Sequence, residues 1–388
     1  MQTDHAVHVG DARDCPLDDD AVDLVVTSPP YPMIEMWDDL FRELSPAAGA
    51  ALDEGDGERA FTAMHDALDP VWDELARVLA PGGIACVNVG DATRTVEEFA
   101  LYPNGDELAT RLRERGLTHL PGIRWRKPTN SGTKFMGSGM LPPNAYPTLE
   151  HERVLVVRNG GPRTLEPNAD ERYEAAYFWE ERNEWFSDLW TFAGADQRLD
   201  ERARERSAAY PLELPLRLVR MFSAYGDRVF DPFWGTGTTS LAAMFAGRNS
   251  VGVELDASLV DAFADRLADV PERSRARATD RLERHAAFAA DRETNYEAEH
   301  YDFGVVTAQE RRIRPYAVET VTERTTAADA ATERAGTATG DRAGGDGDLS
   351  SEGLATTAPD GGRDADTGAA TRRWTCEHAP VEFSPSGR

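Results

Sequence analysis

Two short strings of residues, far apart in the chain, have the types and spacing that a chemical site needs. Ser28-Pro29-Pro30-Tyr31 follows an apolar run, Leu24 to Val26, that predicts a buried strand. The second string precedes a helical pattern and contains Asp231, Pro232, Phe233, Gly235, Gly237, Thr238 and Thr239. Two prolines stiffen the first loop, so its polar and aromatic groups are held in fixed positions. The glycines of the second string allow a tight turn and let a ligand approach backbone N–H groups.

An acidic residue follows the glycine string at the distance expected for a ribose contact. Glu254 ends the apolar run Val251 to Val253, about twenty residues beyond the turn, and Leu255 and Asp256 follow it. The third glycine of the dinucleotide pattern is missing, and the chain has no G-x-x-x-x-G-K motif. A ribose–adenine ligand without a pyrophosphate therefore fits best, and S-adenosylmethionine is the common one.

At these positions the chain resembles the amino-group DNA methyltransferases that act on cytosine N4 or adenine N6. Ser28-Pro29-Pro30-Tyr31 matches the catalytic motif of that family, and the string from Asp231 to Thr239 matches its cofactor motif. Three further segments match family segments that flank or contact the cofactor: Gly10-Asp11-Ala12, Pro211-Leu212 and Glu254-Leu255-Asp256. The catalytic motif precedes the cofactor motif, which is the order of the permuted β group. The resemblance covers roughly residues 5 to 270.

The resemblance implies S-adenosylmethionine as the cofactor and double-stranded DNA as the partner. The methyl group would go to a base flipped out of a short duplex sequence. Serine at the start of the catalytic loop leans toward the N4 amine of cytosine, whereas Asp or Asn leans toward adenine N6, so the adenine reaction stays open. An RNA base is a further alternative substrate. A non-catalytic cofactor-binding subunit is an alternative from another class.

An exocyclic amine is a poor nucleophile because its lone pair is delocalised into the ring. Acceptors that bind its hydrogens let it pyramidalise, and we expect the Ser28 side chain and the Pro29 carbonyl to do so. Tyr31 offers a ring on which the flipped base can stack. No covalent intermediate is needed. Methylation at cytosine carbon 5 would need a nucleophilic cysteine beside a proline, and Cys15-Pro16 has the wrong order and an acidic setting.

Strand-like runs alternate with helical patterns up to about residue 315, which predicts an α/β sheet covered by helices on both faces. Combined with the resemblance, this predicts a Rossmann-like methyltransferase fold with a mixed, mostly parallel sheet. We expect residues 1–315 to form the catalytic domain. Residues 316–388, rich in Thr, Ala, Gly and Asp, are expected to form a disordered acidic tail. The three cysteines fit neither a disulfide framework nor a zinc site, and we expect no metal.

Two segments are candidates for DNA recognition. The polar loop 124–147 contains both lysines of the chain, and its candidates for phosphate contacts are Arg124, Arg126, Lys127 and Lys134. A solvated loop explains the same residues equally well. The segment 160–205 is rich in aromatic residues, and a satellite hydrophobic cluster is the alternative to a recognition element there.

The formal net charge is −27, and lysine occurs only twice. This composition is typical of a protein adapted to high salt, where a strongly charged surface stays solvated. At molar salt the Debye length falls to about 3 Å, so local arginine contacts can still bind DNA. No apolar run approaches the ~18 residues of a membrane helix, and no signal segment is visible at the N-terminus, so we expect a cytoplasmic protein. A cognate restriction endonuclease is a candidate partner.

Overall fold

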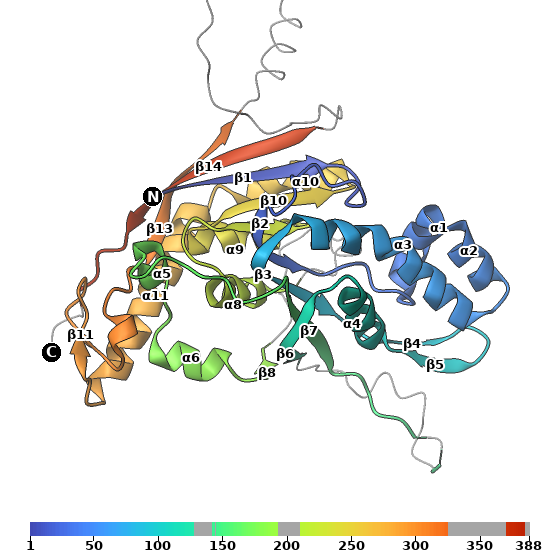
Figure 1. Cartoon of the computed structure of the whole chain (residues 1–388), viewed down its shortest axis with the longest axis horizontal. Coiled ribbons are helices and arrows are strands. Elements are labelled where there is room, and N and C mark those ends of the chain that lie inside the picture. Colours follow the sequence, from blue (N-terminus) through green and yellow to red (C-terminus); the bar gives the residue numbers. More distant parts are fainter. Residues whose placement is uncertain (128–141, 144, 193–209, 325–369, 385–388) are drawn as a thin grey trace, which may run out of the picture.

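The computed structural model describes residues 1–127, 142–143, 145–192, 210–324 and 370–384. At their centre lies a ten-stranded sheet of order β13-β14-β1-β10-β9-β2-β3-β7-β6-β8 (Figure 1). Its strands are β1 (Gln2–Val9), β2 (Val22–Thr27), β3 (Leu79–Val89), β6 (Thr118–Arg126), β7 (His151–Arg158), β8 (Leu189–Thr191), β9 (Arg228–Asp231), β10 (Asn249–Glu254), β13 (Tyr316–Arg324) and β14 (Thr371–Pro380). Two small hairpins pair β4 (Ala92–Thr95) with β5 (Phe99–Tyr102) and β11 (Tyr296–Glu297) with β12 (Gly304–Val305).

The five central strands β1, β10, β9, β2 and β3 run parallel. Strands β14 and β7 pair antiparallel with their outer members, and β13 and β6 continue the sheet antiparallel. Because the carboxyl ends of parallel strands meet at one edge of a sheet, the loops after β1, β2, β9 and β10 are brought together there. The predicted mixed, mostly parallel sheet is confirmed.

Helices cover both faces of this sheet (Figure 1). Val25 faces the core under the helices near the N-terminus, whereas its neighbours Leu24 and Val26 face the core on the other side. Such a strand is apolar on both faces and forms a continuous hydrophobic run, as is usual for buried parallel sheets. The helices of the first face are η1 (Glu35–Trp37), α1 (Asp38–Leu44), α2 (Pro46–Asp53), α3 (Gly57–Val78) and α4 (Asn104–Glu114). The core on the second face includes residues of α8 (Glu213–Phe222), α9 (Thr238–Ala246), α10 (Ala257–Phe263) and α11 (Val270–Ala290).

Part of the predicted tail belongs to the sheet, so the tail prediction is wrong for residues 316–324 and 371–380. Strand β14 pairs along β1, from Gln2 opposite Glu377 to His8 opposite Thr371. Trp374 is buried and packs edge-on against Phe263. These segments have too few apolar residues to fold alone, but β14 pairs with β1 and β13 pairs with β14, and this pairing satisfies their backbone groups. Residues 325–369 and 385–388 lie outside the described residues.

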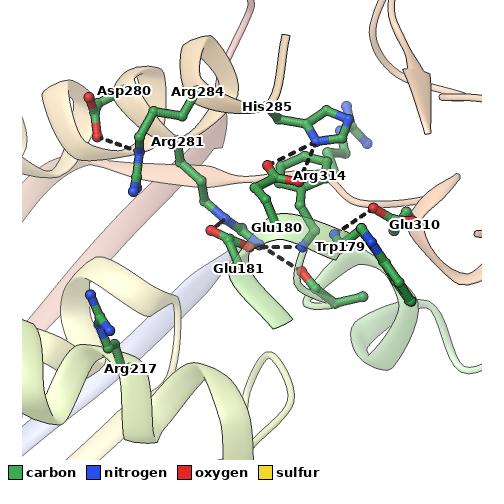
Figure 2. Close-up of polar contacts among 12 residues, drawn as sticks. Trp179, Glu180, Glu181, Arg217, Asp280, Arg281, Arg284, His285, Glu310 and Arg314 are labelled. Carbon is green, nitrogen blue, oxygen red and sulfur yellow. Dashed lines mark hydrogen bonds and ion pairs between the residues drawn. The ribbon is translucent and has the colours of Figure 1, made fainter. Parts of the chain in front are cut away.

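The aromatic-rich segment forms α5 (Asp170–Glu174) and α6 (Trp179–Trp185), and α6 lies close to α11 (Figure 2). Arg281 donates to both carboxylate oxygens of Glu181 at 2.7 and 2.8 Å. Burial acts to raise the pKa of Glu181, but the charge and hydrogen bonds of Arg281 outweigh it and lower that pKa. Phe178 stacks on His285 of α11. The described part of this segment therefore packs as a structural cluster, as one of the two interpretations predicted.

Glu180, His285 and Glu310 place possible metal-ligand atoms within 4.8 Å of one another. Each is already engaged, since His285 bonds Glu180 at 3.0 Å and Glu310 accepts the Trp179 N–H at 2.7 Å (Figure 2). These bonds tie α6 to α11 and to η3 (Ala308–Glu310), so we assign the group a structural role. None of the helices in the described part of the chain combines the length and apolar content of a membrane span.

Candidate active site

A cavity of about 340 Å³ opens at the carboxyl edge of the central strands. The catalytic loop contributes Ser28, Pro29 and Pro30 to its wall. The glycine string contributes Asp231, Pro232, Phe233, Trp234, Gly235, Thr236 and Thr238. The two strings were predicted to share one site, and this juxtaposition is confirmed.

A buried hydrogen bond joins the two strings directly. The Thr27 hydroxyl, at the end of β2, donates to Asp231 Oδ1, at the end of β9, over 2.6 Å. The Thr239 hydroxyl of α9 lies 2.7 Å from Asp231 Oδ2, and the Phe233 N–H donates to Oδ1. Asp231 thus holds the end of β2, the glycine turn and α9 in one arrangement. It also borders the cavity, but its carboxylate bonds are made within the protein.

Burial raises the pKa of Asp231 from 3.8 to about 6, against the lowering effect of its hydrogen bonds. The Tyr210 hydroxyl, 3.4 Å from Asp231 Oδ2 and also bonded to Thr239, is among these donors. Because these donors surround the Asp231 carboxylate, they favour its ionised form near neutral pH.

Glycine is required at the two positions of the turn for different physical reasons. Both have positive φ, +53° at Gly235 and +73° at Gly237. A Cβ on Gly237 would lie 2.5 Å from Phe263 and 2.6 Å from Trp234, so packing excludes any side chain there. Gly235 lines the cavity and has no such neighbour. Gly235 is therefore the glycine at which a ligand can approach the backbone.

Glu254 lies beside this turn because it is the last residue of β10, the neighbour of β9. Its Oε2 accepts the Gly235 N–H at 2.7 Å and its Oε1 accepts the Asp256 N–H at 2.8 Å. Burial raises the pKa of Glu254. Because β1 pairs with β10 up to Val9 opposite Glu254, the loop containing Asp11 and Ala12 borders the same end of the cavity.

The opposite wall of the cavity is apolar, and the sequence predicted it only in part. It consists of Met36, Trp37, Leu40 and Leu44 from η1 and α1, with Ala67, Leu68 and Val71 from α3. The stretch from Glu35 to Glu58 follows the catalytic loop and was a weak candidate for a lid over the substrate, because its sequence is mainly acidic. The helix that follows was not predicted to contribute to the site. This wall gives the cavity a mixed polar and apolar lining, which is typical of small-molecule sites.

Several predicted site residues do not line the cavity. Tyr31 is buried, and its hydroxyl bonds Ser28, Asn88 and Glu152. The Thr239 hydroxyl donates to the Val26 carbonyl, and Gly237 packs closely against Phe263 and Trp234. Pro211 and Leu212 directly precede α8. Leu255 and Asp256, by contrast, do line the cavity. The predicted residues at the strand ends are therefore brought together at the cavity, whereas Tyr31, Pro211, Leu212, Gly237 and Thr239 do not line it.

Of the predicted DNA-contact residues, Arg124 and Arg126 lie on β6 and Lys127 follows it, and all three have partners. Arg126 forms an ion pair with Glu150 at 2.9 Å. Lys127 pairs with Glu152, the same carboxylate that bonds Tyr31. Arg124 is exposed and contacts His151. Lys134 and most of the polar loop lie outside the described residues, as does the end of the segment 160–205.

An open sheet with parallel central strands, and a cavity at their carboxyl edge, is the arrangement of Rossmann-like folds. A family model described as DNA methylase, of the N6/N4 type, matches residues 22–265. The chain belongs to this family, the DNA methyltransferases that modify exocyclic amino groups of bases. The family depends on S-adenosylmethionine, which is the cofactor predicted from the sequence.

Individual relatives agree with this assignment. Type II methyltransferase M.MthZI from Methanothermobacter thermautotrophicus is 48% identical over 323 residues, covering 81% of this chain and 91% of that protein. Type II methyltransferase M.MjaI from Methanocaldococcus jannaschii is 45% identical over 280 residues, covering 69% and 92%. Among solved structures, the putative DNA modification methylase TTHA0409 from Thermus thermophilus, complexed with S-adenosyl-L-methionine, is 31% identical with a TM-score of 0.51. The match covers 68% of this chain and 92% of that one.

Proposed function

We propose that the cavity binds S-adenosylmethionine with its ribose at Glu254 and its adenine beside Asp11 and Ala12. A carboxylate is the usual partner of a ribose hydroxyl pair at the end of a second strand. TTHA0409, with a similar fold, is a complex with this cofactor. The polar end of the cavity suits the adenosine, and the Gly235 turn gives access to the backbone.

The methyl acceptor proposed here is the N4 amine of a cytosine flipped out of duplex DNA. The observation that carries this proposal is the common cavity of Ser28 and the glycine turn, held together by the Thr27–Asp231 bond. In this proposal Ser28, which lines the cavity, accepts an amino hydrogen while the amine faces the methyl group. The amine attacks the methyl carbon, the carbon–sulfur bond breaks, and the sulfur keeps its electron pair. Adenine N6 is the alternative, since its amine has the same geometry.

We propose that double-stranded DNA approaches the side of the sheet formed by β6 and the edge strand β8. Arg124 and Arg126 are exposed on that strand, and we propose that they contact phosphates. Arg126 must leave Glu150 to do so, whereas Lys127 is committed to Glu152. Type II relatives support a setting in restriction and modification, with a cognate endonuclease as partner.

The test is methylation of unmethylated genomic DNA with labelled S-adenosylmethionine, followed by mass spectrometry of the nucleosides. We expect N4-methylcytosine from wild-type protein and none from Ser28→Ala. N6-methyladenine would overturn the choice of base but keep the family chemistry. Label in RNA alone, or cofactor binding without any turnover, would refute the proposed function.

A further inference from the structure

A chain of hydrogen bonds runs from the catalytic loop toward the protein surface. Ser28 Oγ lies 2.8 Å from the Tyr31 hydroxyl, which donates to Glu152 Oε2 at 3.1 Å. Asn88, at the end of β3, donates one amide hydrogen to the Tyr31 oxygen at 2.9 Å and another to Glu152 at 2.5 Å. Lys127 pairs with the other oxygen of Glu152. The chain therefore connects a residue of the cavity wall with a charged pair at the ends of β6 and β7.

The chemistry of these groups fixes the direction of every bond. An ionised carboxylate only accepts, so the single hydrogen of Tyr31 must go to Glu152. The amide nitrogen of Asn88 only donates, so the Tyr31 oxygen is an acceptor toward it. Ser28 then has no hydrogen to receive from Tyr31 and must donate its own. Its lone pairs are left for a ligand in the cavity.

We propose that Glu152, acting through Tyr31, holds Ser28 as a hydrogen-bond acceptor for the target amine and receives the proton that methyl transfer releases. This inference rests on the proposed function, but it holds for either base because both present an amine. Glu152 and Tyr31 are positioning residues here, and Ser28 is the group that touches the substrate. An acceptor fixed before the reaction is worth more than one that must reorient during it.

The proton balance follows the same path. The amine nitrogen forms a bond to the methyl carbon, the carbon–sulfur bond breaks, and the sulfonium becomes a neutral thioether. The nitrogen now carries an excess proton, which passes to Ser28 Oγ. Ser28 passes its own proton to Tyr31, and Tyr31 passes its proton to Glu152. The base leaves as a neutral methylated amine, and Glu152 leaves the step protonated.

Glu152 is suited to end this path because it reaches solvent. Its side chain is 14% exposed and that of Lys127 is 34% exposed, so the proton can be returned to water after turnover. Lys127 balances the charge of Glu152 between turnovers and lies 4.6 Å from the centre of the Trp125 ring. A negative charge without this partner would be costly to place beside the buried Tyr31.

Two substitutions interrupt the chain while keeping its shape. Tyr31→Phe keeps the aromatic ring but removes the oxygen, and Glu152→Gln keeps the size but removes the charge. We expect each to lower the single-turnover methylation rate by about 100-fold. The dissociation constant for S-adenosylmethionine should stay at the wild-type value. Both variants should fold, although Tyr31→Phe should lower the melting temperature by about 4–8 °C because it removes a buried, hydrogen-bonded hydroxyl. The double variant should be no slower than the slower single variant, because both changes break one path.

The control is Asp106→Asn, which removes an exposed carboxylate that pairs with Arg153, the next residue on β7. Its rate should equal that of wild-type protein. A wild-type rate in Tyr31→Phe or Glu152→Gln would overturn the inference while leaving the proposed function intact. Independent, multiplying losses in the double variant would also overturn it. Failure of wild-type protein to methylate any DNA would instead refute the proposed function, and this inference with it.

Discussion

Replacing Thr27 by valine removes the bond between the catalytic strand and the cofactor turn without changing the side-chain volume much. The Thr27 hydroxyl is fully buried and donates over 2.6 Å to a buried carboxylate. A hydrogen bond to a charged group contributes about 1.5–3 kcal/mol. We therefore expect the free energy of unfolding to fall by about 2 kcal/mol. Thr27→Ser is the matched control, because it keeps the hydroxyl and loses one methyl group, at a cost of about 1 kcal/mol.

The loss should depend on pH through Asp231. Burial raises the pKa of this carboxyl to about 6, and the Thr27 hydroxyl is the first of the bonds that lower it. Because the folded pKa is above the ordinary value, the protonated group favours folding at low pH, and this contribution is lost as the pH rises through about 6. Without Thr27 the pKa rises further. The difference between valine variant and wild type should thus be largest near neutral pH and shrink toward about pH 5.

The assay is denaturant unfolding at several pH values, combined with single-turnover methylation. Since the bond aligns the catalytic loop with the cofactor, Thr27→Val should also lower the methylation rate by about tenfold, and Thr27→Ser should retain it. Equal stability and equal rate in the valine variant would refute the reasoning. A loss of stability without any pH dependence would refute the role given to Asp231.

Three further changes test other parts of the structure. Gly237→Ala forces a Cβ within 2.6 Å of Phe263 and Trp234 at a φ of +73°, so the free energy of unfolding should fall by at least about 2 kcal/mol; wild-type stability would contradict the packing reason. Glu254→Gln should weaken S-adenosylmethionine binding roughly tenfold in calorimetry, and an unchanged affinity would argue against a ribose contact. Trp374→Ala should cost about 3–5 kcal/mol in unfolding experiments, whereas an unchanged melting temperature would remove β14 from the folded core.

The composition makes a prediction of its own. Because the net charge is −27, the excess acidic side chains repel one another at low ionic strength, and salt screens that repulsion. We expect the melting temperature to rise steadily from low to molar sodium chloride. A melting temperature that is highest at low salt would contradict adaptation to high salt.

The sequence was sufficient to predict which loops form the site, because these loops follow the ends of recognisable strands. Leu24 to Val26, Val229-Phe230 and Val251 to Val253 are apolar runs that end at polar or glycine residues. Once these runs are parallel neighbours, Ser28, Gly235 and Glu254 must meet at one edge. No side-chain detail is needed for that step, which is why it was visible in the sequence.

The contacts behind that edge could not be predicted, because they depend on pairing between distant segments. Glu152 reaches Tyr31 only because β7 pairs with β3 next to β2, and an acidic residue at a strand start gives no sign of this. Trp374 belongs to the segment expected to be a disordered tail, but it is buried against Phe263 by the pairing of β14 with β1. The ion pair between Lys127 and Glu152 also depends on the register between β6 and β7, in which Trp125 lies opposite Glu152.

The most direct test of the central claim is a crystal structure of the protein with bound S-adenosylmethionine. We predict the ribose at Glu254, the adenine beside Asp11 and the methyl group facing Ser28 and Pro29 across the cavity. A cofactor bound elsewhere, or bound in the cavity with its methyl group turned away from the catalytic loop, would contradict it.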